Sequence, residues 1–251
     1  PCKVQFVGIG ETPTPNLGPQ NRAHGCVDQW HSETGEFEVA LDPGSYRLVI
    51  TRGIEYGHLI REIKVQSGKF TLVQGSLKRL VDSSGWVSTD FHNHSTPSGD
   101  NQCGTDDRII NLAAEHIEFA PTTEHNRLYD WAPHIEKLGL SHFLSTIVGL
   151  ELTGRGAGSH HNAFPLPKPN PFAQDGGAPV FQTDPRLNAI ALQNFGGWDP
   201  DRWVHINHPN LSEKFWDRNQ DGKADGGFVG YSDLINAIES QNFRGNDILA
   251  T

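Results

Sequence analysis

The stretch DDRIINLAAEHIEFAPTTEHN, residues 106–126, decides the fold expected for this chain. Its first half places Ile109, Leu112 and His116 at helical spacing. Its second half, EFAPTTEH, is a short run typical of a strand, and it ends in a carboxylate and an imidazole. A helix followed at once by a strand predicts an α/β domain with a parallel sheet.

Further helix-like and strand-like runs follow this stretch along the chain. LYDWAPHIEKLGL (128–140) has helical spacing, whereas FLSTIVGLEL (143–152) and WVHINHP (203–209) are typical of strands. YSDLINAIES (231–240) predicts a helix, although its apolar run could also begin a strand. We therefore expect residues 83–251 to form an α/β domain.

The first part of the chain, residues 1–82, has a different pattern. Apolar and polar residues alternate in GEFEVAL (35–41), YRLVITRG (46–53) and IREIKV (60–65), with a DPGS turn at 42–45. Short strands at this spacing predict a small all-β sandwich domain. The stretch TGEFEVALDPGSYRLVI also resembles the carboxypeptidase regulatory-like β-sandwich module, which implies a structural or adhesive role.

The composition narrows the classes of function. The 251 residues carry a formal net charge of -10 without a Lys/Arg cluster, which argues against nucleic acid as a partner because phosphates need a basic face. No apolar run approaches the roughly 20 residues that cross a bilayer, so we expect no membrane span. The cysteines are Cys2, Cys26 and Cys103, and they leave open both a Cys2–Cys26 disulfide and free thiols.

Histidines and carboxylates gather at the ends of the predicted strands. If residues 86–92 form a strand, His92 and His94 point the same way, because side chains alternate along a strand. Taken alone, these two histidines could also belong to a surface loop. The later strand ends carry Glu124, His125, Glu151, His160, His161, Asn162 and His208. Because the C-terminal ends of parallel strands meet at one face, we expect these groups to converge on divalent metal ions.

The motifs DFHNHS, TEHN, GLELTG, HHNAFPL and NHP resemble, in order and spacing, those of the PHP (polymerase and histidinol phosphatase) metallohydrolases, in the branch of the carbaryl hydrolases. The resemblance covers residues 86–251 and implies a distorted (β/α)7 barrel that holds two or three divalent ions. Carried over by motif, the implied metal ligands are His92, His94, Asp100, His125, Glu151, His160 and His208. His161 is the alternative to His160, and Glu151 would bridge two ions.

The sequence departs from this family near its C-terminal end. The family closes its site with an Asp-x-His motif, and no histidine follows His208 in this sequence. We therefore expect the C-terminal part of the barrel to be missing from the chain. A further C-terminal segment or a second chain would then complete the barrel.

A second metal site is predicted in DRNQDGKAD, residues 217–225. Oxygen ligands at alternate positions followed by glycine match the start of a calcium loop. The candidate ligands are Asp217, Asn219, Asp221 and Asp225. Phe228 stands where an EF-hand has its bidentate glutamate, so the alternatives are a partial calcium loop and a solvated turn.

The residues and the resemblance together predict a metal-dependent hydrolase acting on a small-molecule ester, either a phosphoester or a carbamate or carboxyl ester. Zn, Mn or Fe suits an imidazole-rich site better than Mg alone, and such ions activate water. The candidate catalytic residues are Glu124, which would orient His125 or move a proton, and Asn162, which would contact substrate. For Glu124 the alternative is a hydrogen-bond partner in the second layer around the metal.

A different class of function remains as the alternative. A non-catalytic, metal-containing binding or scaffold protein would also keep these ligands. The β module and the candidate disulfide favour an extracytoplasmic location, periplasmic or secreted, in a bacterium.

Overall fold

The computed structural model describes residues 1–19, 24–154, 160–207, 217–225, 227–228 and 232–239. Contacts divide the chain into two compact units that interleave along the sequence. The first unit comprises residues 1–90, 99–120 and 131–146, and the second comprises 91–98, 121–130 and 147–251. Because these units are defined by contacts and interleave along the sequence, they do not test the domain boundary that we expect between residues 82 and 83. That boundary stays a prediction.

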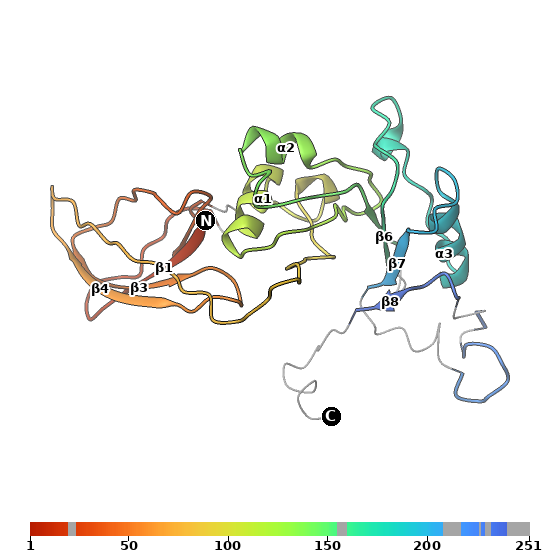
Figure 1. Ribbon diagram of the computed structural model, residues 1–251, viewed down its shortest axis with the longest axis horizontal. Coiled ribbons are helices and arrows are strands. Elements are labelled where there is room, and N and C mark those ends of the chain that lie inside the picture. The colour runs from red at the N-terminus through yellow and green to blue at the C-terminus, as the bar shows by residue number, and fades with distance from the viewer. Residues whose placement is uncertain (20–23, 155–159, 208–216, 226, 229–231, 240–251) are drawn as a thin grey trace. The chain divides into compact units, whose positions relative to one another are not determined.

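The first unit is built on a four-stranded antiparallel sheet in the order β2-β1-β3-β4 (Figure 1). Its strands are β1 (Cys2–Gly8), β2 (Gln29–Ser32), β3 (Gly44–Thr51) and β4 (Leu59–Val65). Side chains alternate along these strands, so Val4 and Phe6 of β1 meet Tyr46 and Leu48 of β3 in a buried core. The alternating runs 46–53 and 60–65 therefore located β3 and β4.

The expected β-sandwich is wrong, because the described strands of this unit form one sheet instead of two packed sheets. Residues 35–41, expected as a strand, lie outside the strands, yet Val39 and Leu41 pack on the core from this loop. Helix α1 (Thr105–Ala114) packs against β1 and β2. The alternation thus predicted which side chains face the core, but it did not predict backbone pairing.

Two predicted helices are confirmed. Helix α1 carries Asp106 and Asp107 in its first turn, where carboxylates stabilise the positive end of the helix dipole. Helix α2 (Ala132–Lys137) is shorter than the helical pattern of 128–140. Within the described part of the chain, every helix falls short of the length and apolar character that a membrane span needs.

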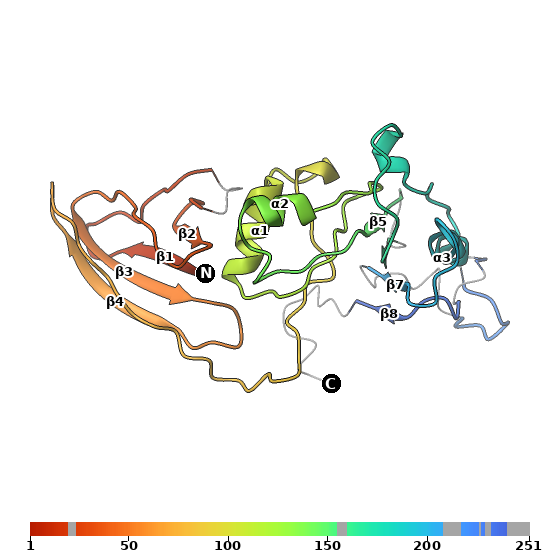
Figure 2. The same cartoon turned by 45° about the horizontal axis from the view of Figure 1, so that its top comes forward.

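The second unit contains a four-stranded mixed sheet in the order β5-β6-β7-β8 (Figure 2). Its strands are β5 (Leu150–Leu152), β6 (His161–Phe164), β7 (Trp203–Ile206) and β8 (Ala237–Ile238). The short 3₁₀ helices η1 (Thr96–Ser98) and η2 (Gln174–Gly177) also belong here. Helix α3 (Pro185–Asn194) packs against β6 and β7, and its Leu192 joins the core of the sheet.

The expected distorted (β/α)7 barrel is wrong. Barrel strands all run parallel, whereas β5–β6 and β6–β7 are antiparallel pairs, and β7–β8 is the only parallel pair among the strands of the described residues. The connection from Leu152 to His161 is shorter than the roughly 12 residues that a parallel crossover needs, so β5 and β6 can pair only antiparallel. The helix expected over 231–240 is also wrong in its described part, where β8 forms. The alternating runs indicated elements but not the direction of the strands.

The cysteines do not pair in the structure. Cys2, Cys26 and Cys103 form no disulfide. The strand register explains this for the first two, because Cys2 lies opposite Ser32, while Cys26 pairs with Gln29 at the other end of β2. The free-thiol alternative therefore describes the structure.

Candidate metal centre

One face of the second sheet carries the polar residues of the site. Leu150 and Leu152 of β5 point into the apolar core, so Glu151 between them points to the opposite face. Its neighbours across the sheet are Asn162 in β6 and His205 in β7, and all three are buried. A carboxylate is therefore fixed on a hydrogen-bonded sheet and kept from water.

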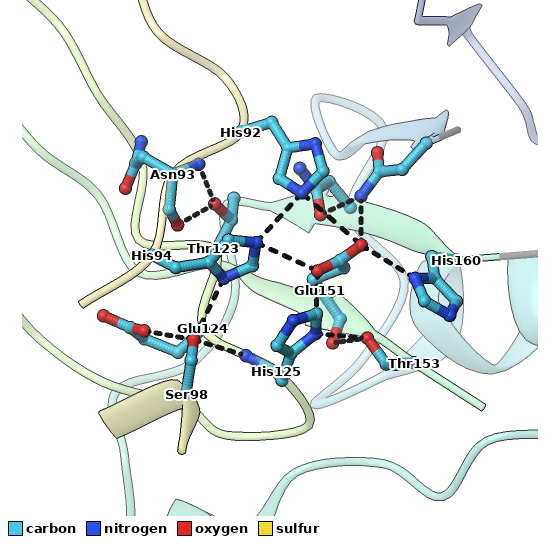
Figure 3. Close-up of polar contacts among 12 residues, drawn as sticks. His92, Asn93, His94, Ser98, Thr123, Glu124, His125, Glu151, Thr153 and His160 are labelled. Carbon is cyan, nitrogen blue, oxygen red and sulfur yellow. Dashed lines mark hydrogen bonds and ion pairs between the residues drawn. The ribbon is translucent and has the colours of Figure 1, made fainter. Parts of the chain in front are cut away.

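His92 and His94 reach this face from a segment held by side-chain hydrogen bonds. The backbone N–H of Asn93 donates to Thr123 Oγ1 (2.7 Å), and the Thr123 hydroxyl donates to the Asn93 carbonyl oxygen (2.6 Å). The strand expected over 86–92 is wrong, because only an isolated bridge forms in it. The two imidazoles nevertheless lie on the same side, as Figure 3 shows, because Asn93 takes the opposite direction into the interior.

Four imidazoles surround the carboxylate of Glu151 (Figure 3). His92 Nε2 lies 3.4 Å and His160 Nδ1 lies 3.2 Å from Oε1. On the other oxygen, His94 Nε2 lies 3.2 Å and His125 Nδ1 lies 2.8 Å from Oε2. Four of the histidines expected as metal ligands therefore lie around Glu151, and their role as ligands stays a prediction.

His92, His94 and Glu151 form a group that can hold a metal ion, since one ligand atom from each lies within 4.8 Å of the others. The Nε2 atoms of His92 and His94 are 3.0 Å apart. With a metal–nitrogen distance of about 2.1 Å, neighbouring ligand atoms are about 3.0 Å apart in an octahedral site and about 3.4 Å apart in a tetrahedral one. The distance between the two nitrogens fits this interval, whereas their shortest contacts with Glu151, 3.4 Å and 3.2 Å, lead to different oxygens of the carboxylate.

Both rings are anchored from behind, which determines the nitrogen that faces the site. His92 Nδ1 lies 2.5 Å from Glu239 Oε1, and His94 Nδ1 lies 2.9 Å from Ser98 Oγ. A carboxylate accepts hydrogen bonds, so Glu239 favours a proton on Nδ1 of His92. The Nε2 atoms then provide the lone pairs that a cation needs.

The charges of the site are strongly coupled. Burial alone would lower the pKa of His92, but Glu151 and Glu239 outweigh burial and raise the pKa to about 9. Burial alone would raise the pKa of Glu151, but the surrounding imidazoles hold it well below its ordinary range. Burial lowers the pKa of His205 to about 4, so this ring is neutral. Without a metal, a proton on His92 provides the positive charge beside Glu151.

The two histidines of SHHNAFPL have different surroundings. His160 contacts Glu151 through Nδ1, and its Nε2 lies 3.3 Å from the Gly154 carbonyl oxygen. His161 is fully buried and lies in register with Leu152 and Ile206, on the face opposite Glu151. Alternation along β6 thus separates the two rings, and the assignment of His160 as the ligand stays a prediction.

Three further expected ligand sets stay predictions. Asp100 is exposed and belongs to the first unit, and His208 lies outside the described residues. In the candidate calcium loop, Asp217 accepts hydrogen bonds from the backbone N–H groups of Asp221 and Gly222. Further contacts within the loop include Asn219 Nδ2 to Asp221 Oδ2 at 3.0 Å and Arg218 Nε to Asp225 Oδ2 at 3.1 Å. These contacts describe a polar turn, and calcium binding stays a prediction.

The candidate catalytic residues both hold other parts of the site. Asn162 Nδ2 donates to the Phe91 carbonyl oxygen (2.8 Å), and Asn162 Oδ1 accepts from Asn207 Nδ2 (2.7 Å). Glu124 is fully buried and accepts hydrogen bonds from Ser95 and Ser98. These bonds favour positioning by both residues, and direct roles in catalysis stay predictions.

Sequence reasoning missed several residues of the site. Asn207 Nδ2 also donates to Glu151 Oε1 (2.9 Å), and Thr153 Oγ1 lies 2.6 Å from His125 Nδ1. Asn207 lies within the motif NHP and Thr153 lies within GLELTG. The available signal was therefore the polar residues next to the expected ligands in these motifs. Glu239 gave no such signal, because it lies 147 positions from His92 in the sequence and reaches this residue only through the tertiary fold.

No family model, curated protein or solved structure matches the chain. The chemistry of the site therefore rests on the contacts described above.

Proposed function

We propose that this chain is a metal-dependent hydrolase that uses the His92–His94–Glu151 group to act on a small-molecule phosphoester, carbamate or carboxyl ester. The observation that carries the proposal is the convergence of two imidazole Nε2 atoms and a buried carboxylate at distances that suit a shared cation. Zn, Mn or Fe is the expected ion, because the donor set is mostly imidazole.

The other imidazoles support a site with more than one ion. His160 lies at the Glu151 oxygen that His92 also faces, and His125 lies at the oxygen that His94 faces, so each oxygen has two imidazoles beside it (Figure 3). A carboxylate has two oxygens to share between cations, whereas each imidazole offers one lone pair. Glu151 is thus the group best suited to a bridging position.

The chain's own residues prepare the site for hydrolysis. A bound divalent cation would lower the pKa of a coordinated water and stabilise the oxyanion that forms on the ester. From its buried position, Glu151 would offset the charge of such a cation. Asn207 holds Glu151 by its amide and so fixes the carboxylate before any ligand arrives.

The proposal is tested by hydrolysis of aryl phosphate and aryl ester substrates with the purified chain, first treated with a chelator and then titrated with Zn or Mn. We expect turnover that appears with metal and is lost in the His92→Ala variant. Tight metal binding without turnover on either substrate class would instead indicate the non-catalytic binding protein. Failure to bind any of these ions would overturn the proposed metal site itself.

A further inference from the structure

Glu124 forms a buried network directly behind the metal centre. Its side chain is fully buried, and the Ser95 backbone N–H donates to Oε2 at 3.0 Å. The Ser95 hydroxyl donates to Oε1 and the Ser98 hydroxyl donates to Oε2, each at 2.5 Å. Such short bonds are typical of hydroxyls that donate to a carboxylate. Glu124 therefore fixes the direction of the Ser98 hydroxyl.

The hydrogen-bonding capacity of Ser98 is then fully assigned. A hydroxyl has one proton to donate and two lone pairs to accept with, and its proton is directed at Glu124. One lone pair accepts from the backbone N–H of His125 at 3.1 Å. The other faces His94 Nδ1 at 2.9 Å and can only accept there. Nδ1 of His94 must therefore carry a proton.

We propose that Glu124 and Ser98 form a positioning relay that sets the tautomer of His94, so that Nδ1 is protonated and Nε2 is the ligand atom. Figure 3 shows this chain of contacts running from Glu124 through Ser98 to His94. The same serine also holds the backbone of His125, so one hydroxyl aligns two rings around Glu151. The relay depends on the proposed metal site for its purpose, but the tautomer can be measured without metal.

The direct test is nitrogen NMR of protein labelled with ¹⁵N in histidine. In metal-free wild-type protein at alkaline pH, we expect His94 to show the Nδ1–H tautomer, and zinc to shift its Nε2 resonance. An Nε2–H tautomer in the wild-type protein would overturn the relay, whether or not any variant folds. Absence of a zinc effect, with the expected tautomer intact, would overturn the proposed function and leave the relay standing.

Variants separate tautomer control from general packing. Ser98→Ala should give His94 a mixture of tautomers and lower zinc affinity by about 10–100-fold, the range for the loss of an outer partner of a ligand. Glu124→Gln should also mix the tautomers, because an amide can donate as well as accept. Ser98→Thr keeps the hydroxyl and should restore the single tautomer and the affinity.

Ser95→Ala is the matched control. It removes a hydroxyl bond of the same length from the same carboxylate, but at Oε1, while the Ser98 bond to Oε2 remains. We expect the His94 tautomer to be unchanged in this variant. If Ser98→Ala and Ser95→Ala lowered zinc affinity equally, with an unchanged tautomer in both, the network would be merely structural and the proposal would be wrong.

Discussion

His92 Nε2 and His94 Nε2 lie 3.0 Å apart, and each ring is held from behind through its Nδ1 atom. Because the backbone between them is tied to Thr123, neither ring can turn freely. A ligand pair ordered in advance loses little side-chain entropy when a cation binds. The pair therefore forms, with Glu151, an ordered group that could hold a metal ion.

The first prediction concerns Glu151. Glu151→Gln keeps the size of the side chain but removes the charge that offsets a cation, so zinc affinity should fall by more than the roughly 10–100-fold typical of an outer partner. Isothermal titration calorimetry measures this change. Glu136→Gln is the control, since Glu136 is exposed on α2 and its loss should leave zinc affinity unchanged. Equal affinity in Glu151→Gln and wild-type protein would remove Glu151 from the ligand set.

The second prediction concerns acid stability of the first unit. Glu55 is buried, its carboxylate accepts from Arg79 Nη2 at 2.9 Å, and Oε2 lies 2.6 Å from His116 Nδ1. Ser83, Arg79 and His116 lower the pKa of Glu55 below 4.5. The resulting stability is present above pH 4.5 and is lost as the pH falls through the lower folded-state value.

Glu55→Gln should therefore lower the free energy of unfolding by about 1–3 kcal/mol at neutral pH and flatten its dependence on acid pH. Urea unfolding at a series of pH values measures both effects. Glu62→Gln provides the comparison, because Glu62 pairs with Arg47 on the surface and should cost at most about 1 kcal/mol. The same acid profile in Glu55→Gln and wild-type protein would contradict the assignment.

The third prediction concerns the C-terminal end of α3. The buried guanidinium of Arg202 donates to the carbonyl oxygens of Leu192, Gln193 and Phe195 at 2.7–3.0 Å. These are the groups that a helix end leaves without partners. Arg202→Met should remove these bonds, leaving Leu192 with only the Phe195 backbone N–H as a partner, and lower the free energy of unfolding by about 2–4 kcal/mol.

Hydrogen exchange at the α3 amides reports this loss locally. Arg186→Met is the control, because Arg186 is exposed in the first turn of the same helix. We expect its α3 amides to exchange at the wild-type rate. Wild-type protection in Arg202→Met would mean that water replaces the guanidinium at little cost.

The sequence predicted which residues gather at the site better than it predicted the architecture. Motif residues such as His92 and Glu151 carry their identity locally, and alternation along an extended segment placed His92 and His94 on one side. Alternation does not give strand direction, so it could not distinguish antiparallel from parallel pairing of Glu151 with Asn162, and the short connection from Leu152 to His161 was the signal that could have done so. Glu239 shows the same limit, because its contact with His92 arises only from tertiary folding.

The last prediction contrasts the adjacent residues His160 and His161. His160 contacts Glu151, whereas His161 is fully buried on the opposite face of β6. Replacing the two residues should therefore affect different properties of the protein. His160→Ala should lower metal affinity at least about tenfold and change the unfolding free energy little. His161→Ala should leave a cavity that costs about 2–4 kcal/mol, with near-normal metal affinity in the folded fraction.

Zinc titration and urea unfolding on both variants give four values, and each variant is the control for the other. A reversal, with His161→Ala losing metal and His160→Ala losing stability, would show that the neighbouring ring is the ligand.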